Sequence, residues 1–357
     1  QLTRSAVGWQ VGGATMTEAA PSERDGGIHD HERLMAVIRN GLKERTFKGR
    51  SAVSTLPENQ VDIFPIKLSL KLDEDLEEAL VKEAQSYLTY DLSEAVIDYM
   101  IVQNDDFGSE QNRTIKLLLI GARRAHVEAH LALLKGAGLK PLAIEIPSCA
   151  LNRAFRFAGK GLEQSLLIMN MDETMTTLTG LRNQTILFER SIPAGRDTLI
   201  SGLCQQLKLG REKSKDLLNR MELGQDGDDP QLQESSKGLA ETYMTQTLVE
   251  IVNPELEKLA QEVEKVLIYY ASEMRGATID EIALTGRCGS IAEMDRWMAS
   301  RIQIPTSLFD PDPVPGVMET TSLLGENARR RTGFTVALGL ALRGVTIPSR
   351  VEETVTS

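Results

Sequence analysis

Three short segments carry residue types that could bind a nucleotide or a metal ion. The first is SLLIMNMDETMTTLTGL at residues 165–181, where an apolar run, a polar turn and an alternating run predict a strand, a tight turn and a returning strand. Hairpins of this shape wrap nucleotide phosphates in many α/β proteins, and their turns use small residues that let phosphate approach the backbone. This turn offers Asn170, Asp172 and Glu173 instead. Its carboxylates bring negative charge to the place where phosphate would lie.

The second segment, IALTGRCGS at residues 282–290, predicts a strand, a glycine turn and the start of a helix. The backbone N–H groups around Gly286 could meet an anion or an adenosine there. A βα turn that needs a positive φ at the glycine explains the same residues. We favour this second interpretation, because glycine is generally enriched in turns.

The third segment, HVEAH at residues 126–130, places two histidines four residues apart on one helical face. Glu128 points away from them and no third ligand is near in sequence, so we interpret the segment as the polar face of a surface helix. The acidic segment GQDGDDPQLQE at residues 224–234 lacks the ligand spacing of an EF-hand. The sequence has no Walker A loop, no G-x-G-x-x-G and no nucleophile elbow. We therefore expect no metal site and no catalytic residue.

The composition of the 357-residue chain is that of a globular protein, with 41% hydrophobic and 25% charged residues. Its net charge of −11 and pI near 5.1 argue against nucleic-acid binding and against a polybasic membrane anchor, since both need a basic surface. The most apolar stretch, residues 334–342, is far shorter than the roughly 20 residues that span a bilayer, so we expect no membrane span. The three cysteines lie far apart and predict no disulfide framework, which fits a reducing compartment.

The candidate residues must be positioned by alternating strands and helices. Residues 61–142 read as β-α-β-β-α-β with a polar loop at 103–112, which predicts a compact module inserted in a larger α/β fold. The pattern also predicts a break between two helices at Gly210, and a kink or restart of a long helix at Pro254. Further expected helices are 31–45, 124–136, 150–157, 239–275, 290–301 and 334–343, and further expected strands are 51–56, 139–146, 186–193, 281–284 and 302–304.

Five passages of the chain resemble, in the same order, passages of the PilM family of type IV pilus assembly proteins, which belongs to the actin-like ATPase superfamily and is related to the division protein FtsA. The collinear match covers most of the chain, from Gln1 to about Gly344. The passages are LEEALVKEAQSYLTYDLSEAVIDYMIV, AHVEAHLALLKGAGLKPLAIEIPSCALNRAF, FERSIPAGRDTL, IALTGRCGSI and VALGLALRG.

The resemblance implies an α/β, actin-like (ribonuclease H-like) fold of two lobes with an inserted α+β module of SHS2-like type. On this expectation residues 1–60 and 143–164 form the first lobe, which lacks the first phosphate hairpin of the superfamily. Residues 61–142 form the module, and residues 165–344 form the second lobe, with a helical subdomain at about 208–276. Residues 345–357 are expected to be a flexible tail.

The chain departs from the family at the second phosphate hairpin, which typically reads Asp-x-Gly and here reads Asn170-Met171-Asp172. With Asn170 in place of the family's Asp, the chain lacks a carboxylate that would hold hydrated Mg²⁺. Replacing the glycine by Asp172 places a carboxylate near polyphosphate. Two unit charges about 4 Å apart repel by ~4 kcal/mol at an effective dielectric near 20.

Three further departures fall in the same implied pocket. A Gly-Gly turn is Gly195-Arg196 here, the adenosine turn reads Gly286-Arg287, and the family's Ala-Glu-x-x-Lys aligns with residues 214–218, where both charged positions are changed. An alternative is that Arg196 and Arg287 pair with phosphates, which would give binding without hydrolysis. If a nucleotide is retained, the residues expected to contact it are Asn170, Asp172, Thr174, Gly195, Arg196, Thr285, Gly286 and Arg287.

The resemblance implies a cytoplasmic scaffold of a type IV pilus or related secretion machine, held at the inner membrane by its partners. The expected partner is the tail of a PilN-like inner-membrane protein, gripped between the first lobe and the module, together with other pilus or secretion components. We expect no cofactor and no ATP hydrolysis, with ATP or ADP and Mg²⁺ as the lesser expectation. The alternative is an active actin-like ATPase or filament former of the PilM/FtsA group. The polar C-terminal SRVEETVTS argues against an FtsA-type membrane helix.

Overall fold

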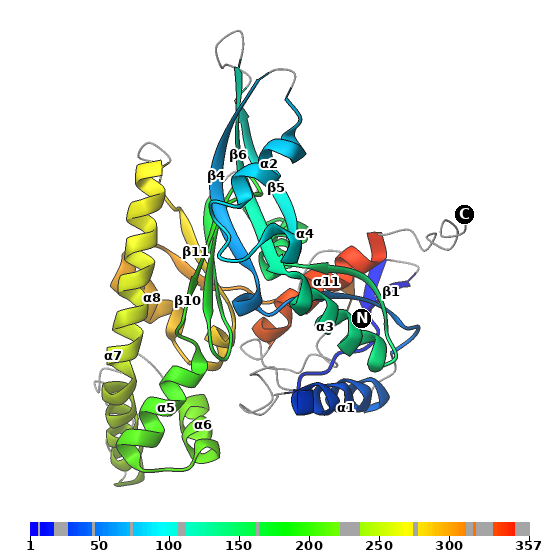
Figure 1. Ribbon diagram of the computed structural model, residues 1–357. Helices are drawn as coiled ribbons and strands as arrows, with labels where there is room; N and C mark the ends of the chain where they lie inside the picture. Colours follow the sequence, from blue (N-terminus) through cyan, green and yellow to red (C-terminus); the bar gives the residue numbers. More distant parts are fainter. Residues whose placement is uncertain are drawn as a thin grey trace.

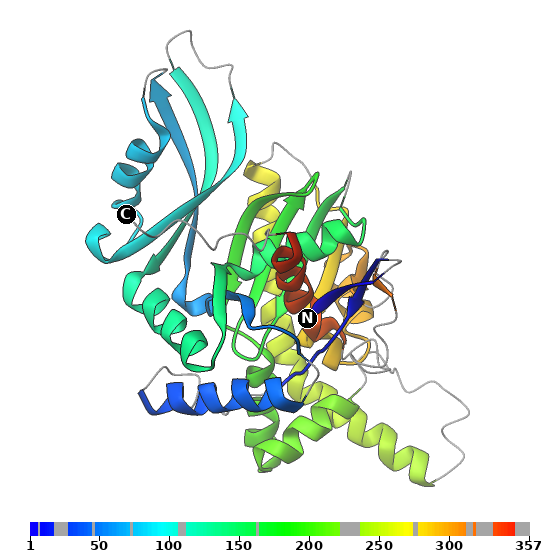
Figure 2. The ribbon, with the colours of Figure 1, turned by 90° about the vertical axis from the view of Figure 1, so that its right-hand side faces the viewer.

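The computed structural model describes residues 1–5, 8–17, 28–44, 47–71, 74–105, 112–161, 164–221, 236–273, 278–311, 317–318 and 331–346. The acidic segment at 224–234 and the expected tail beyond 346 lie outside these residues. The described strands form four sheets, two in the first lobe, one in the inserted module and one in the second lobe. Figure 1 shows the module projecting away from the two lobes, and Figure 2 shows the same arrangement from the side.

The second lobe is built on a five-stranded sheet with the order β10-β9-β8-β11-β12. All seven residues of its central strand β8 are buried, which explains why the segment is apolar without alternation. The predicted hairpin is confirmed, since β8 and β9 pair antiparallel from Ser165 opposite Arg182 to Met171 opposite Thr176. The strands are β8 (Ser165–Met171), β9 (Thr176–Arg182), β10 (Thr185–Ile192), β11 (Glu281–Gly286) and β12 (Thr306–Leu308).

Helices pack on this sheet through one large apolar core that includes Leu203, Leu256 and Tyr270. The predicted break at Gly210 is confirmed, because the glycine caps the second of two helices. Of the two alternatives expected at Pro254, a kink or a restart, the restart is not seen, since the long helix α7 runs through the proline. The kink stays a prediction. The helices are α5 (Arg196–Leu207), α6 (Arg211–Arg220), α7 (Ser236–Glu273) and α8 (Met294–Ile302).

The strand expected at residues 302–304 was wrong. Ile302 is the last residue of α8, and Gln303 follows as a left-handed cap with a φ of 61°. The strand comes later, as β12, and pairs parallel with β11. An apolar residue on each side of Gln303 fits a helix end as well as a strand, so the local pattern did not distinguish them.

The first lobe holds two small sheets covered by helices. One has the order β1-β2-β13, and the other is the parallel pair of β3 and β7. The elements are β1 (Leu2–Ser5), β2 (Gly8–Val11), α1 (Ile28–Glu44), β3 (Ser51–Thr55), the 3₁₀ turn η2 (Glu58–Gln60), α3 (Arg124–Gly136), β7 (Lys140–Glu145), α4 (Pro147–Phe157), β13 (Val317–Met318), the 3₁₀ turn η5 (Thr332–Phe334) and α11 (Thr335–Thr346). Among them, β13 pairs with β2 and α11 packs on α4, although residues 165–344 were expected in the second lobe.

Helices α4 and α11 cross closely on this lobe, at residues that belong to the family-like passages. A Cβ on Gly339 would lie 1.9 Å from the carbonyl oxygen of Ala150, so only glycine allows the approach. Arg153 Nη1 donates to the Gly339 oxygen at 2.7 Å and to Glu145 Oε1 at 2.8 Å. Arg343 binds the same carboxylate from α11. One buried acid thus joins β7 to both helices.

The inserted module is a sheet with the order β4-β6-β5 and one covering helix. Alternate residues of its strands, such as Leu68 and Leu117, form a core with Leu80 of the helix. The sheet has three strands and not the four that the sequence order predicts, because β7 pairs with β3. Strand β5 also continues into part of the expected loop. The elements are β4 (Asp62–Lys71), α2 (Leu76–Ala84), β5 (Ala95–Asp105) and β6 (Asn112–Arg123).

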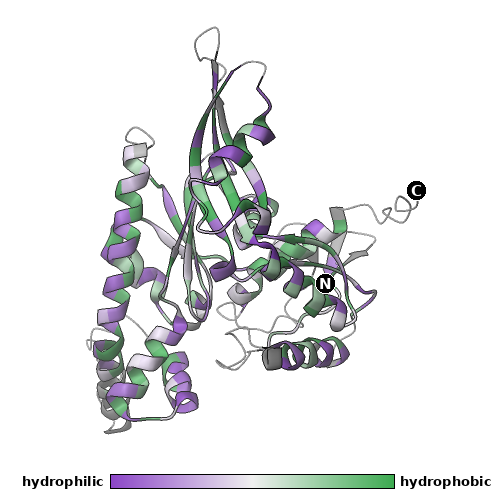
Figure 3. Ribbon diagram, in the orientation of Figure 1, coloured by the Kyte–Doolittle hydropathy of each residue, from purple (hydrophilic) through white to green (hydrophobic). Residues whose placement is uncertain are grey.

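Hydropathy follows the packing of these elements. Figure 3 shows apolar and polar residues alternating along the strands of the module and along α7. Among the described helices, none combines the length and the apolar character that crossing a bilayer requires.

Candidate functional site

The turn between β8 and β9 is closed by its own backbone and by one side chain. The N–H of Asp172 donates to the carbonyl oxygen of Met175 at 2.8 Å. The Asp172 carboxylate accepts a hydrogen bond from the N–H of Glu173, also at 2.8 Å. Asp172 and Thr174 are exposed at the turn, whereas Asn170 is buried at the end of β8.

Helix α5 begins directly against this turn. The N–H of Arg196 donates to the Asp172 oxygen at 3.0 Å, and the N–H of Asp197 donates to the Glu173 oxygen at 2.7 Å. A Cβ on Gly195 would lie 2.5 Å from the Glu173 oxygen, so a glycine is required for the contact. The N–H groups at a helix start are the donors that usually meet phosphate. In this chain two of these donors, the N–H groups of Arg196 and Asp197, already bind carbonyl oxygens of the turn.

The Glu173 carboxylate lies between two guanidinium groups. Arg287 Nε is 2.9 Å from Glu173 Oε1, and Arg196 Nη1 is 3.8 Å from Oε2. Arg196 is only 2% exposed and also donates to Asn219 Oδ1 at 2.7 Å. Arg287 reaches the sulfur of Met16 in the first lobe at 3.3 Å. A carboxylate of the chain itself therefore occupies the place between the two arginines that a phosphate would need.

The glycine turn after β11 packs against the end of β8. Gly286 has a φ of +68°, which confirms the positive-φ interpretation. A Cβ there would lie 2.3 Å from the Met171 oxygen and 2.6 Å from Asn170 Oδ1. Thr285 faces away from the hairpin and hydrogen-bonds Thr335 Oγ1 at 2.6 Å. The conformation of this turn is thus required by packing alone.

Two carboxyl groups lie behind the hairpin and come from different lobes. Glu58 of the first lobe interacts with Asn170 and Thr177, and burial, supported by the charge of Asp172, raises its pKa above the ordinary value. Burial raises the pKa of Glu189 on β10 to about 7, although the neighbouring Ser148 hydroxyl acts in the opposite direction. Part of Glu189 is exposed, but its Oε2 is shielded from solvent.

A cleft of about 460 Å³ lies beside the turn. It is lined by Thr174, Asp197, Thr198, Ser201, Gly202, Gln205 and Glu255. Each of its two carboxylates is paired with a cation, Asp197 with Arg211 and Glu255 with Lys258. In the part of the chain that the structure describes, no group of three or more His, Cys, Asp or Glu could hold a metal ion. The group that does not fit a polyphosphate is Glu173, which lies between the two arginines at the turn itself.

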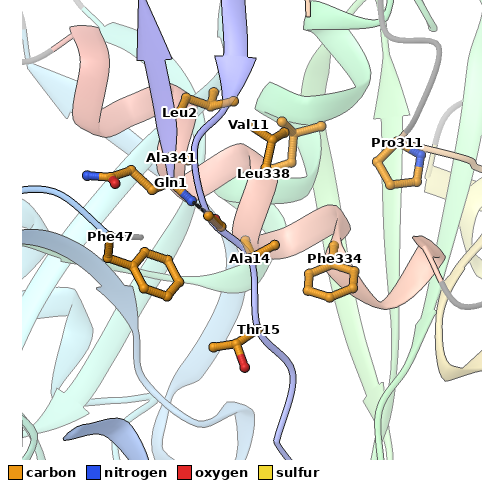
Figure 4. Close-up of a pocket in the computed structure, with 12 residues that line it drawn as sticks. Gln1, Leu2, Val11, Ala14, Thr15, Phe47, Pro311, Phe334, Leu338 and Ala341 are labelled. Carbon is orange, nitrogen blue, oxygen red and sulfur yellow. Dashed lines mark hydrogen bonds between the residues drawn. The ribbon is translucent and has the colours of Figure 1, made fainter. Parts of the chain in front are cut away.

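A second cavity lies in the first lobe between β1, β2 and α11 (Figure 4). It measures about 150 Å³, and its lining is mostly apolar, with Leu2, Val11, Phe47, Phe334 and Leu338 among the residues. No side chain in this lining carries a charge, so the cavity offers apolar contacts and no catalytic group.

The comparison with protein families decides where this arrangement belongs. The model of the family described as type IV pilus assembly protein PilM matches residues 2–345. The chain belongs to the PilM family. The expectation from the five collinear passages is thereby confirmed.

Solved structures show the fold of this PilM-family chain. The protein in a structure titled "PilM-PilN type IV pilus biogenesis complex" has 19% identity and a TM-score of 0.78, over 96% of this chain and 94% of that one. Ethanolamine utilization protein EutJ from Carboxydothermus hydrogenoformans has 12% identity and a TM-score of 0.49, over 89% and 76% of the two chains. The archaeal actin homolog Ta0583 has 12% identity and a TM-score of 0.43, over 87% and 75%. The similarity to the PilM protein of the first of these structures, with the family assignment, confirms the expected fold.

The structure brings most of the expected site residues of this PilM-family chain together. Asn170, Asp172, Gly195, Arg196, Gly286 and Arg287 surround the hairpin turn. Thr285 faces η5 and α11, and Thr174 is an exposed turn residue that lines the cleft beside the turn. That these residues contact a nucleotide stays a prediction, as do the domain boundaries and the SHS2-like nature of the module.

Two groups were missed by sequence reasoning. Glu173 was read only as one acid of the turn, because no local pattern links it to Arg196 and Arg287, which lie in separate passages. Glu58 and Glu189 had no local signal, because they come from different lobes. The HVEAH segment lies on α3, where His130 Nε2 is 2.9 Å from Ser54 Oγ.

Proposed function

We propose that this PilM-family chain is a cytoplasmic scaffold of a type IV pilus or related secretion machine that binds the tail of a PilN-like inner-membrane protein and does not hydrolyse ATP. The family assignment supports the pilus assembly role. The partner is proposed because the similar solved protein is in a PilM–PilN complex. Attachment at the inner membrane would come through that partner.

One observation carries the claim that ATP is not hydrolysed. The Glu173 carboxylate lies between Arg196 and Arg287, and the N–H groups that begin α5 bind the carbonyls of the turn. A polyphosphate would have to break both ion pairs and stay near Asp172. Breaking a buried, charge-assisted contact without replacing it costs about 1.5–3 kcal/mol. Any gain from contacts with the two arginines would be offset by this cost and by the charge of Asp172.

A nucleotide titration tests this claim. We expect the wild-type chain to show no saturable binding of Mg-ATP or Mg-ADP up to about 1 mM, which means binding weaker than about −4 kcal/mol. Replacing Glu173 by Ala releases both arginines, so its affinity for ADP should rise at least about tenfold. Calorimetry measures the binding, and a phosphate-release assay measures turnover.

The control is the double variant Glu173→Ala, Arg287→Ala, which removes the carboxylate together with one of the two cations. Its affinity for ADP should fall back toward the wild-type value. Magnesium-dependent ATP turnover by the wild type that Asp172→Ala abolishes would contradict the scaffold proposal. It would favour an active actin-like ATPase instead.

The partner is tested with a peptide from the N-terminal tail of the PilN-like protein encoded beside this chain. We expect a Kd of about 1 μM or better, or about −8 kcal/mol. Fluorescence anisotropy of the labelled tail measures it, and a scrambled tail of the same composition is the control. Equal binding of the two peptides, or no binding, counts against the partner.

A further inference from the structure

A groove separates the open face of the module sheet from the second lobe. It has a volume of about 130 Å³, and its floor comes from β4, β5 and β6 with Lys67, Val102 and Lys116. Its wall comes from β10 and α7 with Phe188 and Tyr269. Helix α2 covers the opposite face of the same sheet. The residues that line the groove come from the module and from the second lobe.

The wall of the groove is an ordered aromatic surface. A Cβ on Gly180 would lie 2.1 Å from the Phe188 ring, so the glycine on β9 creates the space for this ring. Phe188 meets the edge of Tyr269 with ring centroids 6.4 Å apart. Tyr270 packs on Phe188 at 5.7 Å and donates to Ser165 Oγ at 3.1 Å. The contacts of Gly180 and Tyr270 hold Phe188 in place, so the wall is formed without a ligand.

The outer part of this wall is apolar and exposed. Ile268 is 70% exposed and Tyr269 is 45% exposed, next to each other at the end of α7. Exposed aromatic and aliphatic side chains beside a preformed pocket are the usual anchors of protein–protein contacts. A cavity of this size accepts one apolar side chain.

The floor carries two lysines that make no ion pair with the described residues. Lys67 and Lys116 lie directly opposite each other in the antiparallel β4–β6 pair. Like charges at such positions destabilise a sheet. Neither lysine takes part in any ion pair of the described residues, although the chain has a net charge of −11. A local positive site on an acidic protein selects acidic partners.

We propose that this groove docks an acidic segment of a partner protein that carries an aromatic or aliphatic anchor residue. The anchor enters the pocket beside Phe188 and Tyr269, and flanking Asp or Glu side chains pair with Lys67 and Lys116. The site is separate from the surface proposed for the PilN-like tail, and its test does not depend on that tail.

The test uses the full chain and a labelled synthetic peptide of Asp and Glu residues around a central Phe-Leu pair, followed by fluorescence anisotropy. The key variant is Lys116→Glu. It removes one positive charge from the groove and creates an opposite-charge pair with Lys67, so the Tm should be retained or raised. We expect this variant to lose at least about tenfold in affinity for the peptide. Tyr269→Ala should lose a similar factor.

The matched control is Lys82→Glu, which makes the same charge change on exposed α2 at the other face of the sheet. It should bind the peptide as the wild type does. Equal affinity for a peptide with Lys in place of the acids, or for an acidic peptide without the Phe-Leu pair, overturns the proposal. So does unchanged binding by Lys116→Glu.

Two other occupants are separate outcomes of the same experiment. Self-association in sedimentation that Lys116→Glu abolishes would assign the groove to a second copy of this chain. Binding to phosphatidylserine–phosphatidylcholine vesicles that the same variant abolishes would assign it to a membrane surface. Either result overturns the proposal.

Discussion

Replacing Glu145 by Ala is expected to lower the free energy of unfolding by about 2–4 kcal/mol, a large part of the roughly 5–15 kcal/mol that stabilises a folded domain. The Glu145 side chain is only 4% exposed and binds Arg153 through both oxygens, at 2.8 and 2.9 Å. Arg343 binds it from α11. Removing the acid leaves two neighbouring cations without their shared partner. Their partial exposure keeps the cost below that of a fully buried unpaired charge.

Chemical denaturation of the wild type and the variant measures this loss. Glu145→Gln keeps the volume and one acceptor oxygen but not the charge, so its loss should be intermediate. The matched control is Glu94→Ala, which breaks an exposed ion pair with Arg123 whose Glu94 side chain is 65% exposed. That change should lower the free energy of unfolding by only about 0–1 kcal/mol. If Glu145→Ala costs no more than this control, the acid does not join β7, α4 and α11 as we infer.

Much of the fold around this acid could be predicted from the sequence. Helix α3 begins and ends at the residues predicted from the spacing of Val127, Leu131 and Leu134. The β8–β9 hairpin was predicted because a fully buried strand has a continuous apolar run. The positive φ of Gly286 was predicted because a βα turn needs it. Each of these signals is local.

The errors came from tertiary packing. Nothing in the segment that became β7 shows that it pairs with β3 and leaves the module sheet with three strands. Pro254 removes one helical hydrogen bond, at a cost of about 3 kcal/mol in a helix interior. The core contacts of Val252, Leu256 and neighbouring residues outweigh that cost, so α7 continues.

In the candidate site, too, local features could be predicted from the sequence and tertiary contacts could not. The glycine and arginine positions around the turn could be found from the family-like passages. The ion pair between Glu173 and Arg287 could not, because it joins residues from separate passages and depends on how α5 and the β11 turn approach the hairpin. The resemblance located the pocket, and the structure showed what fills it.

Replacing Glu189 by Gln is expected to change how stability depends on pH. Burial raises the pKa of the Glu189 carboxyl from its ordinary value of 4.5 to about 7, and the charge of Glu58 acts in the same direction. Between these two pH values the folded chain holds a proton that the unfolded chain has released. The contribution of Glu189 to the free energy of unfolding should therefore fall as the pH rises from about 4.5 to 7, and the loss is complete above the folded pKa. Burial lowers the pKa of His130, which contributes with the opposite sign, so the effect of Glu189 is read from the difference between the wild type and the variant.

The expected size of the loss is on the order of 2–3 kcal/mol, because one pKa unit corresponds to about 1.4 kcal/mol and the residue is partly exposed. The neutral amide that Glu189→Gln introduces has the shape of the protonated acid and does not titrate. The variant should match the wild type at pH 5 and exceed its stability at pH 8. Denaturation curves at pH 5, 6, 7 and 8 measure both profiles.

Glu58 is the reason why the variant need not become fully independent of pH. Its own pKa is raised by burial, so a smaller slope of the same sign should remain in Glu189→Gln, and the double variant with Glu58→Gln should remove it. Glu128→Gln, at an exposed position of α3, is the control and should leave the wild-type profile unchanged. A difference in stability between the wild type and Glu189→Gln that stays constant from pH 5 to 8 would show that Glu189 ionises freely. The hairpin would then meet the first lobe through solvent and not through the shielded contacts of Glu58, Ser148 and Glu189.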